Sequence, residues 1–160
     1  MISQSLECAI NAQIATEIWS ANIYLAMSFY CEKEGYEGFA KWMKKQSQEE
    51  MEHASLMAAF IIKRGGTAEI GSIKAVERTW DSPLSMFEVA YEHECFISKK
   101  IDELLEMAIA EKDYAAQDFF WTFVREQVEE EDQASHILDR IKKMGDTALF
   151  NLDQQYGGRQ

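Results

Sequence analysis

"QEEMEHA", residues 48–54, sets acidic side chains and one imidazole into a helical pattern. Glu50 and His53 are three residues apart, so they share one face of a helix, while Glu49 and Glu52 flank that face. The same face carries apolar side chains at heptad-like steps, namely Phe39, Met43, Met57 and Phe60. The sequence therefore predicts a carboxylate and an imidazole on the buried side of a helix, where an unpaired charge costs several kcal/mol.

The composition of the 160-residue chain indicates one ordered, helix-rich domain over residues 1–160. Hydrophobic residues make up 47% of the chain, which is enough for a buried core, and a single Pro leaves room for long helices. The net charge of −12 argues against nucleic acid and anionic membranes as partners and favours cations. We expect no secretory signal, because the first residues lack a basic region followed by an apolar one.

Three cysteines, Cys8, Cys31 and Cys95, are odd in number and far apart in the chain. They match neither a disulfide framework nor a paired CxxC metal motif. We interpret them as reduced thiols of a cytoplasmic protein, with Cys31 packed as a small apolar residue. No apolar run approaches the roughly 20 residues of a membrane-spanning helix, so no membrane partner is expected.

Apolar residues recur at steps of three and four over most of the chain, which predicts an all-α fold. Gly35, Gly65 and Gly145 are typical of helix ends, and Ser82-Pro83 is typical of a helix start. The sequence predicts four long helices and a short fifth one, near residues 5–34, 38–65, 83–111, 113–144 and 147–156.

The connections between these helices predict how they pair. Short turns join the first helix to the second and the third to the fourth, so each pair forms an antiparallel hairpin. Residues 66–82 form a longer connector that can extend roughly 55 Å, while the second helix is about 40 Å long. The connector can therefore run the length of the bundle and leave the second and third helices parallel, in a four-helix bundle with one long crossover.

Each long helix carries an acid near the middle of its inward-facing stripe of apolar residues. These acids are, in chain order, Glu17, Glu50, Glu94 (with Tyr91 on the same stripe) and Glu130. A rise of about 1.5 Å per residue places Glu17 and His53 at one height, and Glu94 and Glu130 a few ångström further along. Carboxylates at one level repel one another unless a cation neutralises them. We therefore predict two adjacent metal positions, with Glu50 between them and able to bridge.

The two hairpins are related by a hidden repeat in the sequence. A shift of 77 residues carries Glu17 onto Glu94 and His53 onto Glu130. The halves differ at the metal motif, because the first carries Glu50-x-x-His53 and the second carries Gln127-x-x-Glu130. Glu-x-x-His is the ligand motif of di-iron carboxylate bundles.

These residues resemble those of the bacterial non-haem ferritins over essentially the whole chain. The matching stretches are EIWSANIYLAMSFY (17–30), QSQEEMEHA (46–54), YEHE (91–94) and VREQVEEE (124–131). The resemblance implies a ferritin-like bundle and an iron storage protein that oxidises Fe(II) to Fe(III) with dioxygen or hydrogen peroxide. It also implies a homo-oligomeric cage of 24 subunits that encloses a ferric mineral.

The resemblance further implies a set of site residues, which we carry over position by position. The first iron would bind Glu17, Glu50 and His53. The second iron would bind Glu50, Glu94 and Glu130, with Gln127 as a hydrogen-bonding neighbour. A third iron site matches Glu49, Glu126, Glu129 and Glu130. Tyr24 matches a tyrosine beside the centre that can donate an electron.

Other proteins share this bundle, and the sequence separates them from the chain. Catalytic di-iron or di-manganese enzymes and bacterioferritins usually carry Glu-x-x-His in both halves, whereas this chain has it once. A rubrerythrin would need a CxxC iron module, which the chain lacks. Bacterioferritins bind haem through a Met at the position of Met51, but Met51 also fits non-haem ferritins, so we expect no haem. A purely structural bundle would leave the acids of the core unexplained.

Aromatic residues outside the inward stripes bear on the assembly. Trp19 and Tyr30 are interpreted as surfaces that need a partner subunit, in support of the cage that the resemblance implies. The alternative is that the long connector covers them within one chain.

Overall fold

The computed structural model describes residues 1–158 and is helical, with no β-strand in that range. The helices are α1 (Gln4–Lys33), α2 (Glu37–Lys63), α3 (Pro83–Ala110), α4 (Tyr114–Met144) and α5 (Leu149–Tyr156), with a 3₁₀ turn at Asp146–Ala148 before α5. The all-α prediction is confirmed, and each long helix begins and ends within two residues of its predicted bounds. None of the described helices is long and apolar enough to cross a membrane.

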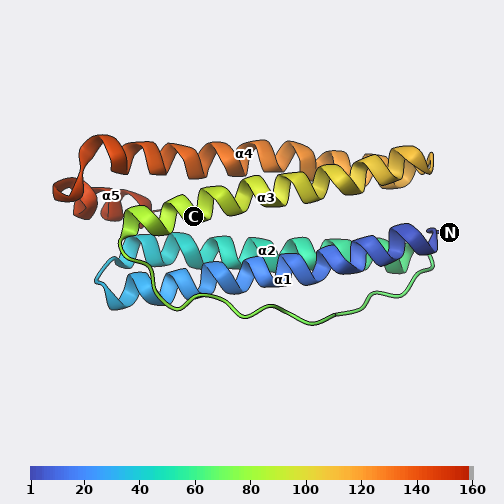
Figure 1. Cartoon of the computed structure of the whole chain (residues 1–160), viewed down its shortest axis with the longest axis horizontal. Coiled ribbons are helices and arrows are strands. Elements are labelled where there is room, and N and C mark those ends of the chain that lie inside the picture. The colour runs from blue at the N-terminus through green and yellow to red at the C-terminus, as the bar shows by residue number, and fades with distance from the viewer. Residues whose placement is uncertain (159–160) are drawn as a thin grey trace.

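The long connector runs along α1 over the length of the bundle, from the end of α2 to the start of α3 (Figure 1), so α2 and α3 point in the same direction. Asn11 fixes the connector to α1 by two hydrogen bonds. Its Nδ2 donates to the carbonyl of Thr67 at 2.9 Å, and its Oδ1 accepts from the amide of Glu69 at 2.8 Å. The predicted bundle with one crossover is therefore confirmed.

Side-chain caps explain where several helices begin. Ser3 caps α1 by accepting a hydrogen bond from Leu6 N at 3.1 Å. Ser82 and Ser85 form a reciprocal capping box at the start of α3, directly before Pro83. At the other end of the chain, Gly145 has a φ of 71°, a conformation that favours glycine. It ends α4, and the 3₁₀ turn that follows makes α5 begin two residues later than predicted.

Two apolar clusters fill the bundle and leave a polar band between them. One cluster lies towards the α5 end and includes Met27, Phe39, Met43 and Phe87. The other lies towards the N-terminus and includes Leu6, Ile10, Met57 and Phe120. The middle of all four long helices therefore carries the buried acids, between two regions whose packing holds the helices in place.

The interpretation of Trp19 and Tyr30 as surfaces for a partner subunit is wrong. Tyr30 is buried and contacts Trp80 of the connector, with ring centroids 5.6 Å apart. Trp19 is half-buried, and the ammonium of Lys74, also in the connector, lies 5.2 Å from its ring. The connector covers both side chains within one chain, so they carry no argument for the cage.

The cysteines are free thiols, as predicted. Cys31 is fully buried and its Sγ lies 3.6 Å from the Sδ of Met86, which confirms its apolar packing. Burial raises the pKa of the Cys31 thiol to about 12, so it is inert at neutral pH.

Candidate metal centre

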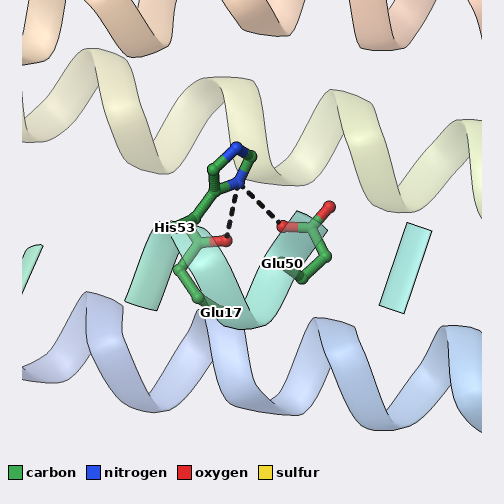
Figure 2. A group of neighbouring side chains, drawn as sticks. All are labelled: Glu17, Glu50 and His53. Carbon is green, nitrogen blue, oxygen red and sulfur yellow. Dashed lines mark hydrogen bonds and ion pairs between the residues drawn. The ribbon is translucent and has the colours of Figure 1, made fainter. Parts of the chain in front are cut away.

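Three side chains from two helices meet inside the polar band (Figure 2). Glu17 comes from α1, and Glu50 and His53 come from successive turns of α2. One ligand atom of each residue lies within 4.8 Å of the other two. All three side chains are at least 95% buried, at 1%, 1% and 5% exposure in that order. Among the described residues this is the one such group of three, and it joins the residues predicted for the first iron.

The hydrogen bonds of this group leave one ligand atom without a partner. His53 Nδ1 lies 3.2 Å from Glu50 Oε2 and 3.9 Å from Glu17 Oε2. Glu17 Oε1 accepts a hydrogen bond from Gln13 Nε2 at 2.8 Å, but the buried Oε2 accepts none. Buried carboxylate oxygens are nearly always satisfied in native proteins. A cation between Glu17, Glu50 and His53 would satisfy this one.

Burial and neighbouring charges shift the protonation of this group. Burial raises the pKa of Glu50 well above its ordinary value, and the nearby carboxylates of Glu17 and Glu94 raise it further. Burial alone would lower the pKa of His53, but the carboxylates of Glu126, Glu17 and Glu50 around its ring raise it instead. Both residues must lose their protons to bind a metal, so metal binding here releases protons.

The residues predicted for the second iron are also buried but are held differently. Tyr24 Oη donates a hydrogen bond to Glu94 Oε1, and Gln127 Nε2 donates to Glu94 Oε2 at 3.1 Å. Glu130 Oε2 accepts from Gln46 Nε2 at 2.9 Å. Glu94 and Glu130 are thus each tied to neutral donors, on the α3 and α4 side of the band.

Burial is also the main influence on protonation in this second group. It raises the pKa of Glu94 to about 7, helped by the charge of Glu130 and opposed by the hydrogen bonds from Tyr24 and Gln127. Burial and the charge of Glu94 raise the pKa of Tyr24 well above its ordinary value, so the phenol stays protonated. A carboxylate that titrates near neutrality can release its proton when a cation arrives.

The residues of the predicted third site lie nearer to solvent. Glu49 is half-buried, and Glu126 and Glu129 are exposed on α4. Glu126 Oε1 lies 2.8 Å from His53 Nε2. The hydrogen bond and the positive charge of His53 lower the pKa of Glu126, against the effect of partial burial. The structure therefore links one residue of this set to the first group through the far side of the imidazole.

Sequence reasoning missed a buried histidine beside the centre. His93 Nε2 lies 2.7 Å from Ser20 Oγ, and the ring meets Trp19 edge-on at 5.2 Å. Burial lowers the pKa of His93 to about 4, so it is neutral. Tyr91, which was predicted on the inward stripe of Glu94, is partly buried and packs against the apolar cluster at the α5 end, and His93 is buried as well. The position of His93 directly before Glu94 was the sequence signal that could have identified it.

Two buried glutamines that donate hydrogen bonds, Gln13 and Gln46, were not assigned a function from the sequence, although both lie on inward stripes. Their amides stabilise carboxylates without adding a positive charge that would compete with a metal. The resulting donor set of several carboxylates and one imidazole suits a hard or borderline metal such as iron. The site thus defines the chain as a metal-binding four-helix bundle protein.

Comparison with known proteins gives this class a family. The ferritin-like domain matches residues 7–144 of the chain. The bacterial non-heme ferritin of Bacteroides fragilis is 57% identical over 159 residues, which is 99% of this chain and 100% of that protein. The bacterial non-heme ferritin of Staphylococcus aureus is 34% identical over 161 residues, covering 99% and 97% of the two chains.

Solved structures agree with the sequence relatives. Crystal structures of an open pore ferritin from the hyperthermophilic archaeon Archaeoglobus fulgidus superpose with a TM-score of 0.98 at 42% identity, over 100% of both chains. The chain therefore belongs to the ferritin family, among the bacterial non-haem ferritins. As a member of this family it binds and stores iron.

Proposed function

We propose that the chain oxidises Fe(II) to Fe(III) at a two-iron centre inside each subunit and stores the product as a ferric mineral in a cage of 24 subunits. One observation carries the proposal: the ligand atoms of Glu17, Glu50 and His53 converge within 4.8 Å in the bundle interior. Glu17 Oε2 accepts no hydrogen bond there, and a metal cation would coordinate this oxygen.

The ligands that we propose for the two irons are those that the family resemblance implies. The first iron binds Glu17, Glu50 and His53. The second binds Glu94 and Glu130 and shares Glu50, whose pKa the charge of Glu94 already influences. Gln127 remains a hydrogen-bond donor at the second position. A third iron site takes Glu49, Glu126 and Glu129 together with Glu130.

The oxidation is balanced by the two irons of one centre. Each Fe(II) loses one electron, and the two electrons with two protons reduce dioxygen to hydrogen peroxide or hydrogen peroxide to water. The iron is the substrate, and the protein supplies ligands that favour the ferric state, because accumulated carboxylates stabilise the higher charge. Tyr24, which donates a hydrogen bond to Glu94, would supply a further electron to the oxidant, with its phenol proton passing to Glu94.

The assembly, the cytoplasmic location and the absence of haem belong to the same proposal. The match to ferritins over the full length of the chain supports a homo-oligomeric cage. Met51 is about half exposed on α2, where a haem would need a second surface to cover it. Protein produced with an adequate haem supply should show no Soret band. A band that disappears in Met51→Leu would place the chain with the bacterioferritins.

Two measurements on the same sample test the proposed function. Light scattering after size-exclusion chromatography should give the mass of about 24 subunits. Aerobic addition of Fe(II) should produce a ferric absorbance that co-elutes with this species. A monomer or dimer under native conditions contradicts the cage, and Fe(II) that oxidises no faster than in buffer contradicts the two-iron centre.

A further inference from the structure

Two ligands of the first metal position are each held by the atom that faces away from it. Gln13 Nε2 donates to Glu17 Oε1 at 2.8 Å, which leaves Oε2 facing the interior. Glu126 Oε1 lies 2.8 Å from His53 Nε2, which leaves Nδ1 facing the two carboxylates. Figure 2 shows Nδ1 of His53 directed towards Glu17 and Glu50. The outer atom of each ligand is occupied, and the inner atom is available to a metal.

The contact from Glu126 decides which nitrogen of His53 is available. A neutral imidazole has one N–H and one lone pair, and only the nitrogen with the lone pair can bind a metal. An ionised carboxylate only accepts hydrogen bonds, so Glu126 keeps the proton on Nε2. Phe123 packs edge-on against the ring at a centroid distance of 5.4 Å. Phe123 and Glu126 therefore fix the orientation of the ring, and the proton that His53 loses when a metal binds is the one on Nδ1.

We propose that Glu126 and Gln13 are positioning residues of the first metal position. Glu126 holds His53 in the tautomer whose Nδ1 binds the metal, and Gln13 holds Glu17 with Oε2 turned inward. The inference rests on the proposed two-iron centre. It gives Glu126 a function at the first position that is separate from its place in the third iron site. Carboxylate partners of metal-binding histidines typically contribute about 10–100-fold to metal affinity.

The chain offers a matched control for Glu126. Glu129 lies one helical turn further along α4, is also exposed, and belongs to the same proposed third site. If Glu126 acts only as a ligand of a third metal, Glu126→Ala and Glu129→Ala should behave alike. If Glu126 positions His53, only Glu126→Ala should weaken the first position. Glu126→Gln separates the roles further, because its amide oxygen still accepts a hydrogen bond from His53 Nε2.

Calorimetric titration of the metal-free assembly with Zn(II), which is not oxidised, measures the first position directly. The Zn(II) site that disappears in His53→Ala defines it. We expect Glu126→Ala to weaken this site about 10–100-fold and Glu126→Gln to retain most of the affinity. Glu129→Ala, which removes a ligand of the third site only, should keep the affinity of the His53-dependent site. Equal losses in all three variants would overturn the positioning role. A wild-type protein without any His53-dependent Zn(II) site would instead overturn the proposed metal centre itself.

A crystal structure of Glu126→Ala loaded with Zn(II) gives a readout that does not depend on affinity. We expect the His53 ring to rotate or to adopt more than one orientation. A single ring orientation, identical to the wild type and with a fully occupied metal at Nδ1, would overturn the role of Glu126.

Gln13 is tested in the same titration by Gln13→Met, which keeps the length of the side chain but removes the donor. We expect the His53-dependent site to weaken about tenfold, which is the low end of the range for loss of a hydrogen-bond partner of a metal ligand. Zn(II) affinity equal to the wild type would overturn the role of Gln13 and leave that of Glu126 standing. Thermal melting of each variant verifies that the bundle is intact.

Discussion

The two helical hairpins carry related residues, but they present them to the interior differently. In the first hairpin, Glu17, Glu50 and His53 converge within 4.8 Å, and one carboxylate oxygen has no hydrogen-bond partner. In the second hairpin, Glu94 is tied to Tyr24 and Gln127. Glu130, which corresponds to His53, is tied to Gln46. The first hairpin is arranged for a cation before one arrives, and the second is arranged around neutral donors.

This difference predicts unequal binding at the two proposed metal positions. A metal at the second position must compete with hydrogen bonds to charged carboxylates, each worth about 1.5–3 kcal/mol. A metal at the first position also coordinates a buried oxygen that accepts no hydrogen bond. We therefore expect the first iron to bind more tightly and the second to be passed on after oxidation.

The largest effect is expected at Glu50, the residue shared by both positions. Glu50→Ala removes a ligand from each iron and should slow the initial oxidation of Fe(II) by more than about 100-fold, a barrier increase of roughly 2.7 kcal/mol or more. Stopped-flow absorbance after addition of a few Fe(II) per subunit measures this rate. The matched control is Glu49→Ala, on the flank of the same helix, which should keep the initial rate and alter later turnovers. Wild-type oxidation by Glu50→Ala would show that Glu50 does not bridge.

The stability of a Glu50 variant distinguishes whether this residue is a metal ligand or a structural partner. Without metal, Glu50 is a buried acid among other acids. When Glu50 is replaced, His53 still has Glu126 and Glu17 as partners. Replacing Glu50 with an apolar residue such as Leu should therefore leave the metal-free protein as stable as the wild type or more stable. Thermal melting of the metal-free proteins tests this, and a loss of several kcal/mol would identify Glu50 as a structural partner.

The next largest effect is expected at His53, which belongs to the first position alone. His53→Ala removes a ligand, so it should weaken the first metal by more than the roughly 100-fold that an outer partner can contribute, and leave binding at the second position largely intact. Anaerobic titration with Fe(II) should then show one weakened and one retained site per subunit. Loss of both sites to the same extent would contradict the separation of the two positions.

Exchanging the motifs sharpens the comparison between the hairpins. The double variant Gln127→Glu, Glu130→His gives the second hairpin the same Glu-x-x-His pattern as the first. We expect it to hold the second metal about tenfold more tightly, because an imidazole and a further carboxylate replace the amide and one carboxylate. Its first oxidation should remain, while repeated turnovers slow because iron leaves less readily. Unchanged turnover would show that these two positions do not control iron release.

The smallest effect concerns protonation in the second hairpin. The pKa of Glu94 is raised from its ordinary value near 4.5 to about 7 by burial. A raised carboxyl pKa stabilises the fold fully below about pH 4.5, and this stabilisation is lost as the pH rises through about 7. Between pH 5 and 8, the metal-free wild type should lose on the order of 2 kcal/mol of unfolding free energy relative to Glu94→Gln.

The comparison with Glu94→Gln removes other titrations from this measurement. The pKa of His93 is lowered to about 4, so its stabilisation is present above about pH 6.5 and lost as the pH falls towards 4. That change has the opposite sign but is common to both proteins. Parallel pH profiles for the two would contradict the raised pKa of Glu94.

Most of the fold could be predicted from the sequence, because helical periodicity and the residues that begin and end helices are local properties. The length of the connector was enough to fix the direction of α3, since its residues can span the bundle. The 3₁₀ turn before α5 was not predicted, because it depends on how α5 docks. Asp153 Oδ1 accepts a hydrogen bond from the amide of Phe39 at 2.7 Å, a contact between distant segments.

The candidate site was only partly predictable, for a similar reason. The spacing of Glu17, Glu50 and His53 on helical stripes sufficed to bring them together. Which oxygen faces inward depends on neighbours such as Gln13, and these hydrogen bonds form only in the packed bundle. Trp19 shows the same limit, because its cover comes from the connector, which has no periodicity to interpret.

The central claim is that two irons lie within one subunit on either side of Glu50. X-ray diffraction near the iron absorption edge, on crystals loaded with Fe(II) without oxygen, locates the metals directly. We predict two anomalous peaks per subunit about 3.5–4 Å apart, with Glu50 between them, one beside Glu17 and His53 and the other beside Glu94 and Glu130. A single peak, or peaks confined to subunit contacts with none at Glu50, would contradict the two-iron centre.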